Sequence, residues 1–215
     1  MTKKKYKHII WDWNGTLFDD AWLSVELINQ VLAKRGMPSV TPEEYSELFH
    51  IPVIEYYRRL GFDFSKESFE EVGTEFIIEY EKRKYECDLQ PDAANVLQEI
   101  ADAGLTQSIL SAYKQDSLKE LIDHFKLSRF FTKIIGLKDH YANGKIEHGK
   151  EWMIHMGHRP HEVLFVGDTL HDFEVAEAIN TDCVLILSGH QPRRKLEKCG
   201  VEILESLADL PRLLI

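Results

Sequence analysis

The sequence predicts an α/β fold: a doubly wound parallel sheet with a Rossmann-like core, into which an all-helical domain is inserted. Short β-branched apolar runs alternate with longer amphipathic stretches, which is typical of a parallel sheet covered by helices. About ninety residues separate the first two of these runs without a comparable strand signal, which is too long for a loop. We therefore predict a core domain of residues 1–19 and 89–215 and a helical domain of residues 20–88.

Five apolar runs are expected to form the strands of the core. Each run is short and nearly continuous in apolar residues, which is the pattern of parallel strands buried on both faces. The runs cover residues 8–13, 107–111, 133–136, 163–167 and 183–187.

Local signals mark helices between these runs. Thr41, Pro42 and Glu44 indicate a helix start, with threonine at the cap, proline at the first helical position and glutamate reaching back to the cap amide. After a turn, a long amphipathic helix is expected over 66–84. Apolar residues recur at helical spacing over 91–103, so the chain has then returned to the alternation of strand and helix.

The composition restricts the classes of partner. A net charge of −10 disfavours general binding to nucleic acid, because the surface repels phosphate polymers. Three cysteines without a C-x-x-C pair suit a reducing compartment, so the cytoplasm is the expected location. We find neither a signal peptide nor an apolar run long enough to span a membrane, and we expect no membrane partner.

The run at 8–13 carries an acidic residue to the end of a strand. Asp12 is followed by Asn14, Gly15 and Thr16, which must turn sharply. Such a turn leaves backbone amides free to face an anion. An aspartate at a strand end is often only a turn former, so this segment alone is suggestive.

A second acidic loop strengthens the prediction of a site. The run at 163–167 leads into Asp168 and Asp172, two carboxylates four residues apart. If the first and fourth strands are neighbours, Asp12 and Asp168 meet at the carboxyl edge of the sheet, where such folds bind ligands. Mg²⁺ is usually held there by one or two carboxylates, substrate phosphate and water.

With these segments the sequence resembles the haloacid dehalogenase superfamily of phosphohydrolases, particularly its phosphoglycolate phosphatase-like members with a helical cap. The resemblance covers essentially the whole chain and implies the strand order 3-2-1-4-5. Four motifs occur in the family's order, with the insertion between the first two. They are Asp12-Trp-Asn-Gly-Thr16-Leu17, Gln107-Ser-Ile-Leu-Ser111, a lysine within Gly144-Lys145-Ile-Glu-His-Gly-Lys150, and Val166-Gly167-Asp168-Thr-Leu-His-Asp172.

The resemblance implies Mg²⁺-dependent hydrolysis of a small phosphorylated metabolite. Asp12 would attack phosphorus and form an aspartyl-phosphate that water then hydrolyses. Mg²⁺ would be held by Asp12, Asp168 and the backbone carbonyl of Asn14. Asp172 would hold a metal-bound water or position a lysine.

The phosphoryl oxygens would be bound by Ser111 and by a lysine, beside the turn at Gly15. We favour Lys145 as this lysine, because a loop position reaches the carboxyl edge of the sheet more readily than the helix interior. Lys150, expected within the following helix, is the alternative.

The sequence departs from the family at one catalytic position. Phosphatases of this superfamily typically carry a second aspartate two residues after the nucleophile, where it acts as a general acid and base; here that position is Asn14. An amide cannot exchange a proton near neutral pH, and such assistance is worth about 10²- to 10⁴-fold in rate. We therefore expect poor leaving groups to be turned over slowly.

Three acidic or basic side chains are candidates for the missing proton donor: His171, Asp19 and Asp20. Carboxylates beside His171 are expected to hold it protonated. Its alternative role is to cap or orient its loop.

Two other functions remain open from the sequence. A phosphonate carbon–phosphorus hydrolase also lacks the second aspartate and uses a lysine of its cap, for which Lys34 or Lys66 would serve. A catalytically weak phosphate-binding or regulatory protein would also tolerate Asn14. The sequence leaves the physiological substrate and the oligomeric state open.

Overall fold

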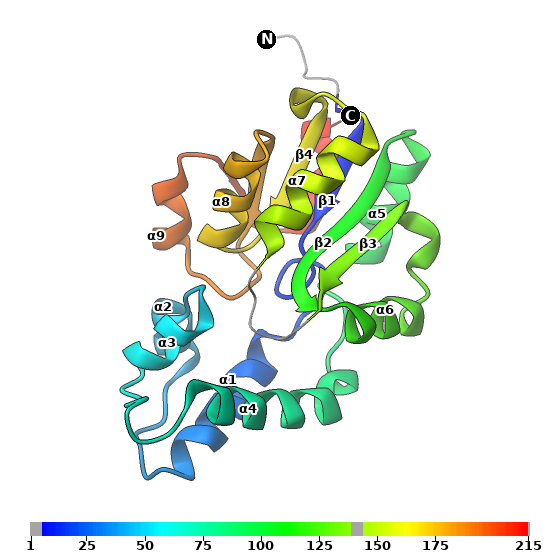
Figure 1. Cartoon of the computed structure of the whole chain (residues 1–215). Helices are drawn as coiled ribbons and strands as arrows, with labels where there is room; N and C mark the ends of the chain where they lie inside the picture. Colours follow the sequence, from blue (N-terminus) through cyan, green and yellow to red (C-terminus); the bar gives the residue numbers. More distant parts are fainter. Residues whose placement is uncertain (1–5, 139–143, 215) are drawn as a thin grey trace.

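The computed structural model describes residues 6–138 and 144–214. Within this part of the chain, a single parallel sheet of six strands has the order β3-β2-β1-β4-β5-β6 (Figure 1). The predicted order 3-2-1-4-5 is confirmed, and a sixth strand extends the sheet. The strands are β1 (His8–Trp11), β2 (Thr106–Lys114), β3 (Lys133–Leu137), β4 (Val163–Gly167), β5 (Asp182–Ile186) and β6 (Glu202–Leu204).

The predicted strand bounds hold for β4 and differ elsewhere. β1 ends at Trp11 instead of residue 13, because the amides of residues 16–18 turn back to donate hydrogen bonds to the carbonyl of Trp13. β2 continues to Lys114, beyond the predicted end at residue 111. We did not predict β6, which has too few residues to show an apolar pattern.

Helices cover both faces of the sheet. The side chains of Ile10 and Phe165 belong to a cluster with α7 and α8. The alternate residues Ile9, Trp11 and Leu164 belong to a cluster with α5 and α6, because successive side chains of a strand point to opposite faces. The helices of the core are α5 (Ala93–Asp102), α6 (Gln115–His124), α7 (Lys145–Met156), α8 (Leu170–Ala178), α9 (Arg193–Leu196) and α10 (Pro211–Leu214).

Residues 20–88, called here the helical module, contain helices and no strand. They form α1 (Ala21–Ala33), α2 (Pro42–Leu48), α3 (Val53–Arg59) and α4 (Phe69–Arg83), which lie together beyond one edge of the core (Figure 1). The predicted start of α2 is confirmed: the Thr41 hydroxyl accepts from the amide of Glu44, whose side chain accepts from the Thr41 amide. The helix expected over 66–84 begins later, because Ser68 and Glu71 make a second capping box.

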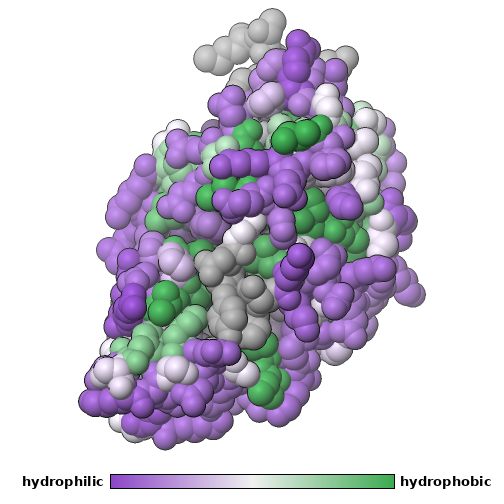
Figure 2. Space-filling view, in the orientation of Figure 1, coloured by the Kyte–Doolittle hydropathy of each residue, from purple (hydrophilic) through white to green (hydrophobic). Residues whose placement is uncertain are grey.

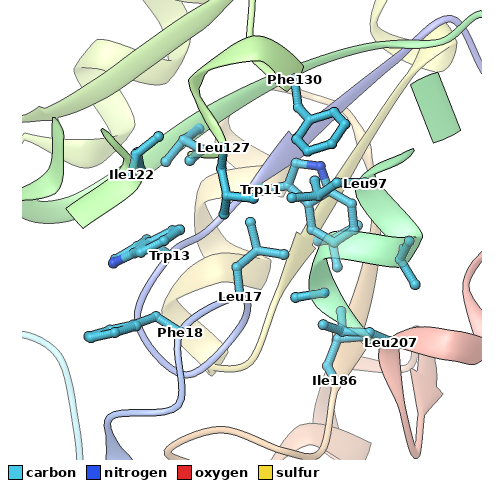
Figure 3. Packing of buried hydrophobic residues seen from close by; sticks show 14 of the residues in the cluster. Trp11, Trp13, Leu17, Phe18, Leu97, Ile122, Leu127, Phe130, Ile186 and Leu207 are labelled. Atoms are coloured by element: carbon cyan, nitrogen blue, oxygen red, sulfur yellow. The ribbon is translucent and has the colours of Figure 1, made fainter. Parts of the chain in front are cut away.

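The turn after β1 is anchored in the hydrophobic core. Trp13 and Phe18 stack with ring centroids 5.4 Å apart, and Leu17 is fully buried beside them. Figure 3 shows these three side chains packed together with Trp11, Leu97 and Ile122. Apolar side chains on both sides of residues 14–16 therefore fix the position of the turn that follows Asp12.

The surface does not present a broad apolar face in the view of Figure 2. Hydrophilic residues cover most of this side, and hydrophobic residues form small separate groups. Among the described residues, no helix has both the length and the apolar character needed to cross a bilayer.

His8 makes the stability of the fold sensitive to acid. Its ring nitrogens lie 2.7 Å from the hydroxyls of Thr106 and Ser108, and burial, with the nearby His158, lowers its pKa to about 4. An unfolded histidine takes up its proton near pH 6.5. The contribution of neutral His8 to the free energy of unfolding should therefore be fully present above that pH. It should decrease by about 3 kcal/mol as the pH falls to 4.

Urea unfolding between pH 7.5 and 4 tests this expectation. His8→Gln, whose amide keeps hydrogen-bonding groups but does not titrate, should flatten the curve in this range. The exposed His155 provides the control, since His155→Gln should leave the pH dependence unchanged. If the free energy of unfolding depends on pH equally in wild type and His8→Gln, His8 is not the source of the acid sensitivity.

Candidate active site

Three buried carboxylates meet at the carboxyl edge of the sheet. Asp12 follows β1, Asp168 follows the neighbouring strand β4, and Asp172 lies in the first turn of α8. One oxygen from each of the three lies within 4.8 Å of the others. The sequence predicted this meeting for Asp12 and Asp168, and the pairing of β1 with β4 produces it.

Lys145 lies among these carboxylates. Its ammonium nitrogen is 2.5 Å from Asp12 Oδ1 and 2.6 Å from Asp172 Oδ1, and its side chain is 2% exposed. We expected Lys145 in a loop, but it is the first residue of α7, so the helix start carries it to the site. Lys150 is exposed on the same helix and does not reach the carboxylates.

When all its groups are ionised, the cluster has an excess of negative charge. Burial, together with Asp172 and Asp168, raises the pKa of Asp12 to about 8, although Lys145 opposes the shift. Burial also raises the pKa of Asp168 to about 6. Asp172 has a lowered pKa, because Lys145 outweighs the effect of burial. Three carboxylates facing one ammonium group form a site that attracts a further cation.

The turn at Gly15 requires glycine. Its φ is +76°, and a Cβ there would lie 2.4 Å from Asp168 Oδ2 and 2.6 Å from the ring of His190. The Gly15 amide donates to the carbonyl of Phe18 and, at 3.0 Å, to Asp20 Oδ1. Our expectation that this amide is free to face an anion is therefore wrong: the turn and Asp20 use it.

Asn14 belongs to a hydrogen-bond network with the helical module. Its Nδ2 donates to Asp20 Oδ2 and to the Tyr80 hydroxyl, both at 2.9 Å. The Tyr80 hydroxyl in turn donates to Asp20 Oδ2 at 2.7 Å. Asp20 precedes α1 and Tyr80 belongs to α4, so this network joins the module to the turn after β1.

His190 is a buried, positively charged residue that we did not predict. Its Nε2 lies 3.4 Å from Asp20 Oδ1, its Nδ1 lies 2.8 Å from the Tyr45 hydroxyl, and its amide donates to Asp168 at 2.7 Å. Burial disfavours its charge, but Asp20 and Asp168 raise its pKa to about 9. The one sequence signal was its position after the fifth strand, at the edge where the other site residues follow their strands.

Ser111 lines a cavity together with the carboxylates. The cavity has a volume of about 190 Å³ and extends from Asp12 and Lys145 to the helical module. We expected Ser111 at a strand end, but it lies within the longer β2, and its hydroxyl accepts from the Tyr113 amide at 3.0 Å. The sheet thus places a hydroxyl beside the charged groups.

The candidate proton donors do not have the properties that we expected. Burial and Lys145 lower the pKa of His171, so the expectation that carboxylates hold it protonated is wrong. Asp19 is half-buried and is not among the residues that line the cavity. Asp20 lines the cavity, but His190 and its hydrogen bonds overcome the effect of burial and lower its pKa. It is therefore a carboxylate at neutral pH.

Comparison with known families agrees with this geometry. The sequence profile of the haloacid dehalogenase-like hydrolases matches residues 9–186, from β1 to the end of β5. The chain belongs to this family. It is therefore a hydrolase, and phosphatases are among its relatives.

Two curated relatives match nearly the whole chain. Phosphoglycolate phosphatase 1 of Pseudomonas aeruginosa is 23% identical over 211 residues, which cover 94% of this chain and 77% of that protein. Tyrosine-protein kinase PtkA of Mycobacterium tuberculosis is 22% identical over 207 residues, which cover 95% of this chain and 70% of that protein.

Solved structures share the fold at low identity. The structure of PtkA from Mycobacterium tuberculosis has a TM-score of 0.82 and 21% identity, covering 98% of this chain and 99% of that one. A haloacid dehalogenase-like family hydrolase from Streptococcus pneumoniae has a TM-score of 0.80 and 16% identity, with each chain fully covered. At these identities the likeness describes the arrangement of sheet and helices alone.

Proposed function

We propose that this hydrolase is a Mg²⁺-dependent phosphatase that acts on a small phosphorylated metabolite through an aspartyl-phosphate. The observation that carries the proposal is the contact of Lys145 with Asp12 within a cluster of three carboxylates. This arrangement pairs a nucleophile with a cation that can bind the phosphoryl group. The three free cysteines agree with a cytoplasmic location.

The carboxylate cluster fits a divalent cation. Its oxygens are hard ligands, and when all groups are ionised the three carboxylates exceed Lys145 by two negative charges. Asp12, Asp168 and the carbonyl of Asn14 would hold Mg²⁺, with Asp172 beside them. The ion would supply charge neutralisation for the phosphoryl oxygens and favour the ionised form of Asp12.

The chain's own groups supply the nucleophile and the phosphoryl-binding contacts. A carboxylate oxygen of Asp12 attacks phosphorus, and the bond from phosphorus to the leaving oxygen breaks. Lys145 and Ser111 bind the transferring oxygens, while Asp172 holds Lys145 in place. Water then attacks phosphorus, and the bond from phosphorus to the Asp12 oxygen breaks, which restores the carboxylate. The protons of the water leave with the inorganic phosphate and to solvent.

A panel of phosphate esters tests the proposal. We expect Mg²⁺-dependent release of phosphate, with aryl and acyl phosphates cleaved at least about 100-fold faster than alkyl phosphates, because Asn14 cannot protonate a leaving alkoxide. A phenol has a pKa of about 10 and leaves as its anion. Equal rates for the two classes contradict this account of Asn14. Absence of release from every ester, despite phosphate binding, indicates the binding or regulatory protein instead.

The carbon–phosphorus hydrolase is not favoured by the structure. Lys34 pairs with Glu75 and Lys66 with Asp63, and both lysines are largely exposed. Neither lines the cavity that contains Asp12. Such an enzyme would need a lysine of the helical module within reach of the substrate carbonyl.

A further inference from the structure

The cavity continues from the phosphoryl-binding groups into the helical module. Asp12, Ser111 and Lys145 line its end at the sheet. Much of the remaining wall comes from the module, chiefly Phe49, Tyr56, Tyr57, Phe69, Phe76 and Ile77. The core adds Tyr113 and Lys114 from β2 and His190. A phosphate ester bound at Asp12 would therefore direct its leaving group into an enclosure of aromatic and aliphatic side chains.

The module offers no cation to this enclosure. Of its residues that line the cavity, Asp20 alone is charged, and it is already paired with His190. Arg35 pairs with Glu67 and Glu75, and Arg58 pairs with Glu55; neither arginine lines the cavity. The cations that line the cavity belong to the core: Lys145 and His190 are paired with aspartates, and Lys114 is exposed at the end of β2. A second carboxylate on a substrate would be desolvated against the module's apolar wall without a partner there, which is costly.

We infer that the substrate is an aryl phosphate monoester with a single uncharged ring, bound in preference to a small phosphorylated carboxylic acid. The inference rests on the proposed function and adds the identity of the leaving group. The size limits the leaving group to one ring: an engineered apolar cavity of about 150 Å³ holds a benzene molecule, and the cavity here measures about 190 Å³ with its phosphoryl-binding end included. Aromatic walls also favour a ring through edge-to-face and offset contacts.

The chemistry at Asn14 points to the same class independently of the cavity. A leaving phenolate needs no proton at the moment when the bond to phosphorus breaks, whereas a leaving alkoxide does. The side chain that could have supplied this proton is an amide held by Asp20 and Tyr80. The site is thus built for a leaving group that is both apolar and stable as an anion.

Binding of two non-hydrolysable phosphonates tests the inference without turnover. Benzylphosphonate carries one uncharged ring, and phosphonoacetate carries a carboxylate on a similarly short linker. Calorimetry with Mg²⁺ and the full chain should give at least about tenfold tighter binding of benzylphosphonate, from burial of the ring's apolar surface. Equal or tighter binding of phosphonoacetate overturns the inference.

Variants that narrow the cavity locate the ring. Gly73 lines the cavity from α4, and the nearest atoms to an added Cβ are those of the Phe69 ring at 3.8 Å. Gly73→Leu should lose most of the preference for benzylphosphonate while its affinity for phosphonoacetate changes less than about threefold. Val53→Phe narrows the same cavity from α3 and serves if Gly73→Leu fails to fold. If a folded variant keeps the wild-type preference for benzylphosphonate over phosphonoacetate, the ring does not bind in this part of the cavity.

The two proposals fail separately. If esters are hydrolysed but benzylphosphonate has no advantage, the phosphatase proposal stands and the aryl assignment is wrong. If benzylphosphonate binds with the expected preference but no ester is hydrolysed, the cavity prefers an aryl group but the phosphatase proposal, and with it the aryl substrate, is wrong.

Discussion

Asp12→Asn should reduce phosphate release by about 10⁴-fold or more. The amide that replaces the carboxylate cannot attack phosphorus, while the change keeps the size of the side chain. Lys145 retains its contact with Asp172, so the fold should survive. Phosphate release and thermal unfolding, measured side by side, distinguish loss of chemistry from loss of structure.

Rapid acid quench with labelled substrate adds a direct measurement. With the label on phosphorus, wild type should retain it on the chain as an aspartyl-phosphate, and Asp12→Asn should not. Asp116→Asn makes the same change at an exposed residue of α6 and should behave as wild type. Release within tenfold of wild type by Asp12→Asn excludes Asp12 as the nucleophile.

Asn14→Asp should raise the rate with alkyl phosphates by about 10²- to 10⁴-fold. The new carboxyl would lie beside Asp20, whose Oδ2 is 2.9 Å from the present amide nitrogen. Two carboxyls at this distance do not both ionise easily, so one holds its proton near neutral pH. That proton is then available to the leaving alkoxide.

The measurement is the ratio of alkyl to aryl hydrolysis rates. This ratio should rise, since aryl phosphates gain little from a proton donor. Asn95→Asp, at an exposed position of α5, adds the same charge away from the site and should leave the ratio unchanged. A ratio that stays constant in Asn14→Asp shows that another group protonates the leaving oxygen.

Signals within one segment were readable from the sequence. Thr41 and Glu44 cap α2 as predicted, because the capping residues bond within a single turn. The buried strand β4 occupies its predicted residues, since a continuous apolar run between polar segments has few other conformations. These predictions depend on neighbours along the chain.

Properties of the site residues were predicted less well. The pKa of His171 is lowered where its acidic neighbours suggested a raised one, because burial outweighs charges that are close in sequence. Lys145 reaches the site from the first position of a helix, not from a loop. His190 was missed, although its contacts with Asp20, Tyr45 and Asp168 are at the centre of the site.

The sequence by itself determined the family, the parallel sheet with its helical insertion, and the residue types available for chemistry, because periodicity and motif spacing are local properties of the chain. Only the tertiary structure decided which lysine meets Asp12, which histidine is charged and what surrounds a leaving group. These outcomes depend on contacts between segments far apart in sequence and on the loss of water around them. Neither these contacts nor the loss of water can be read from a single position of the sequence.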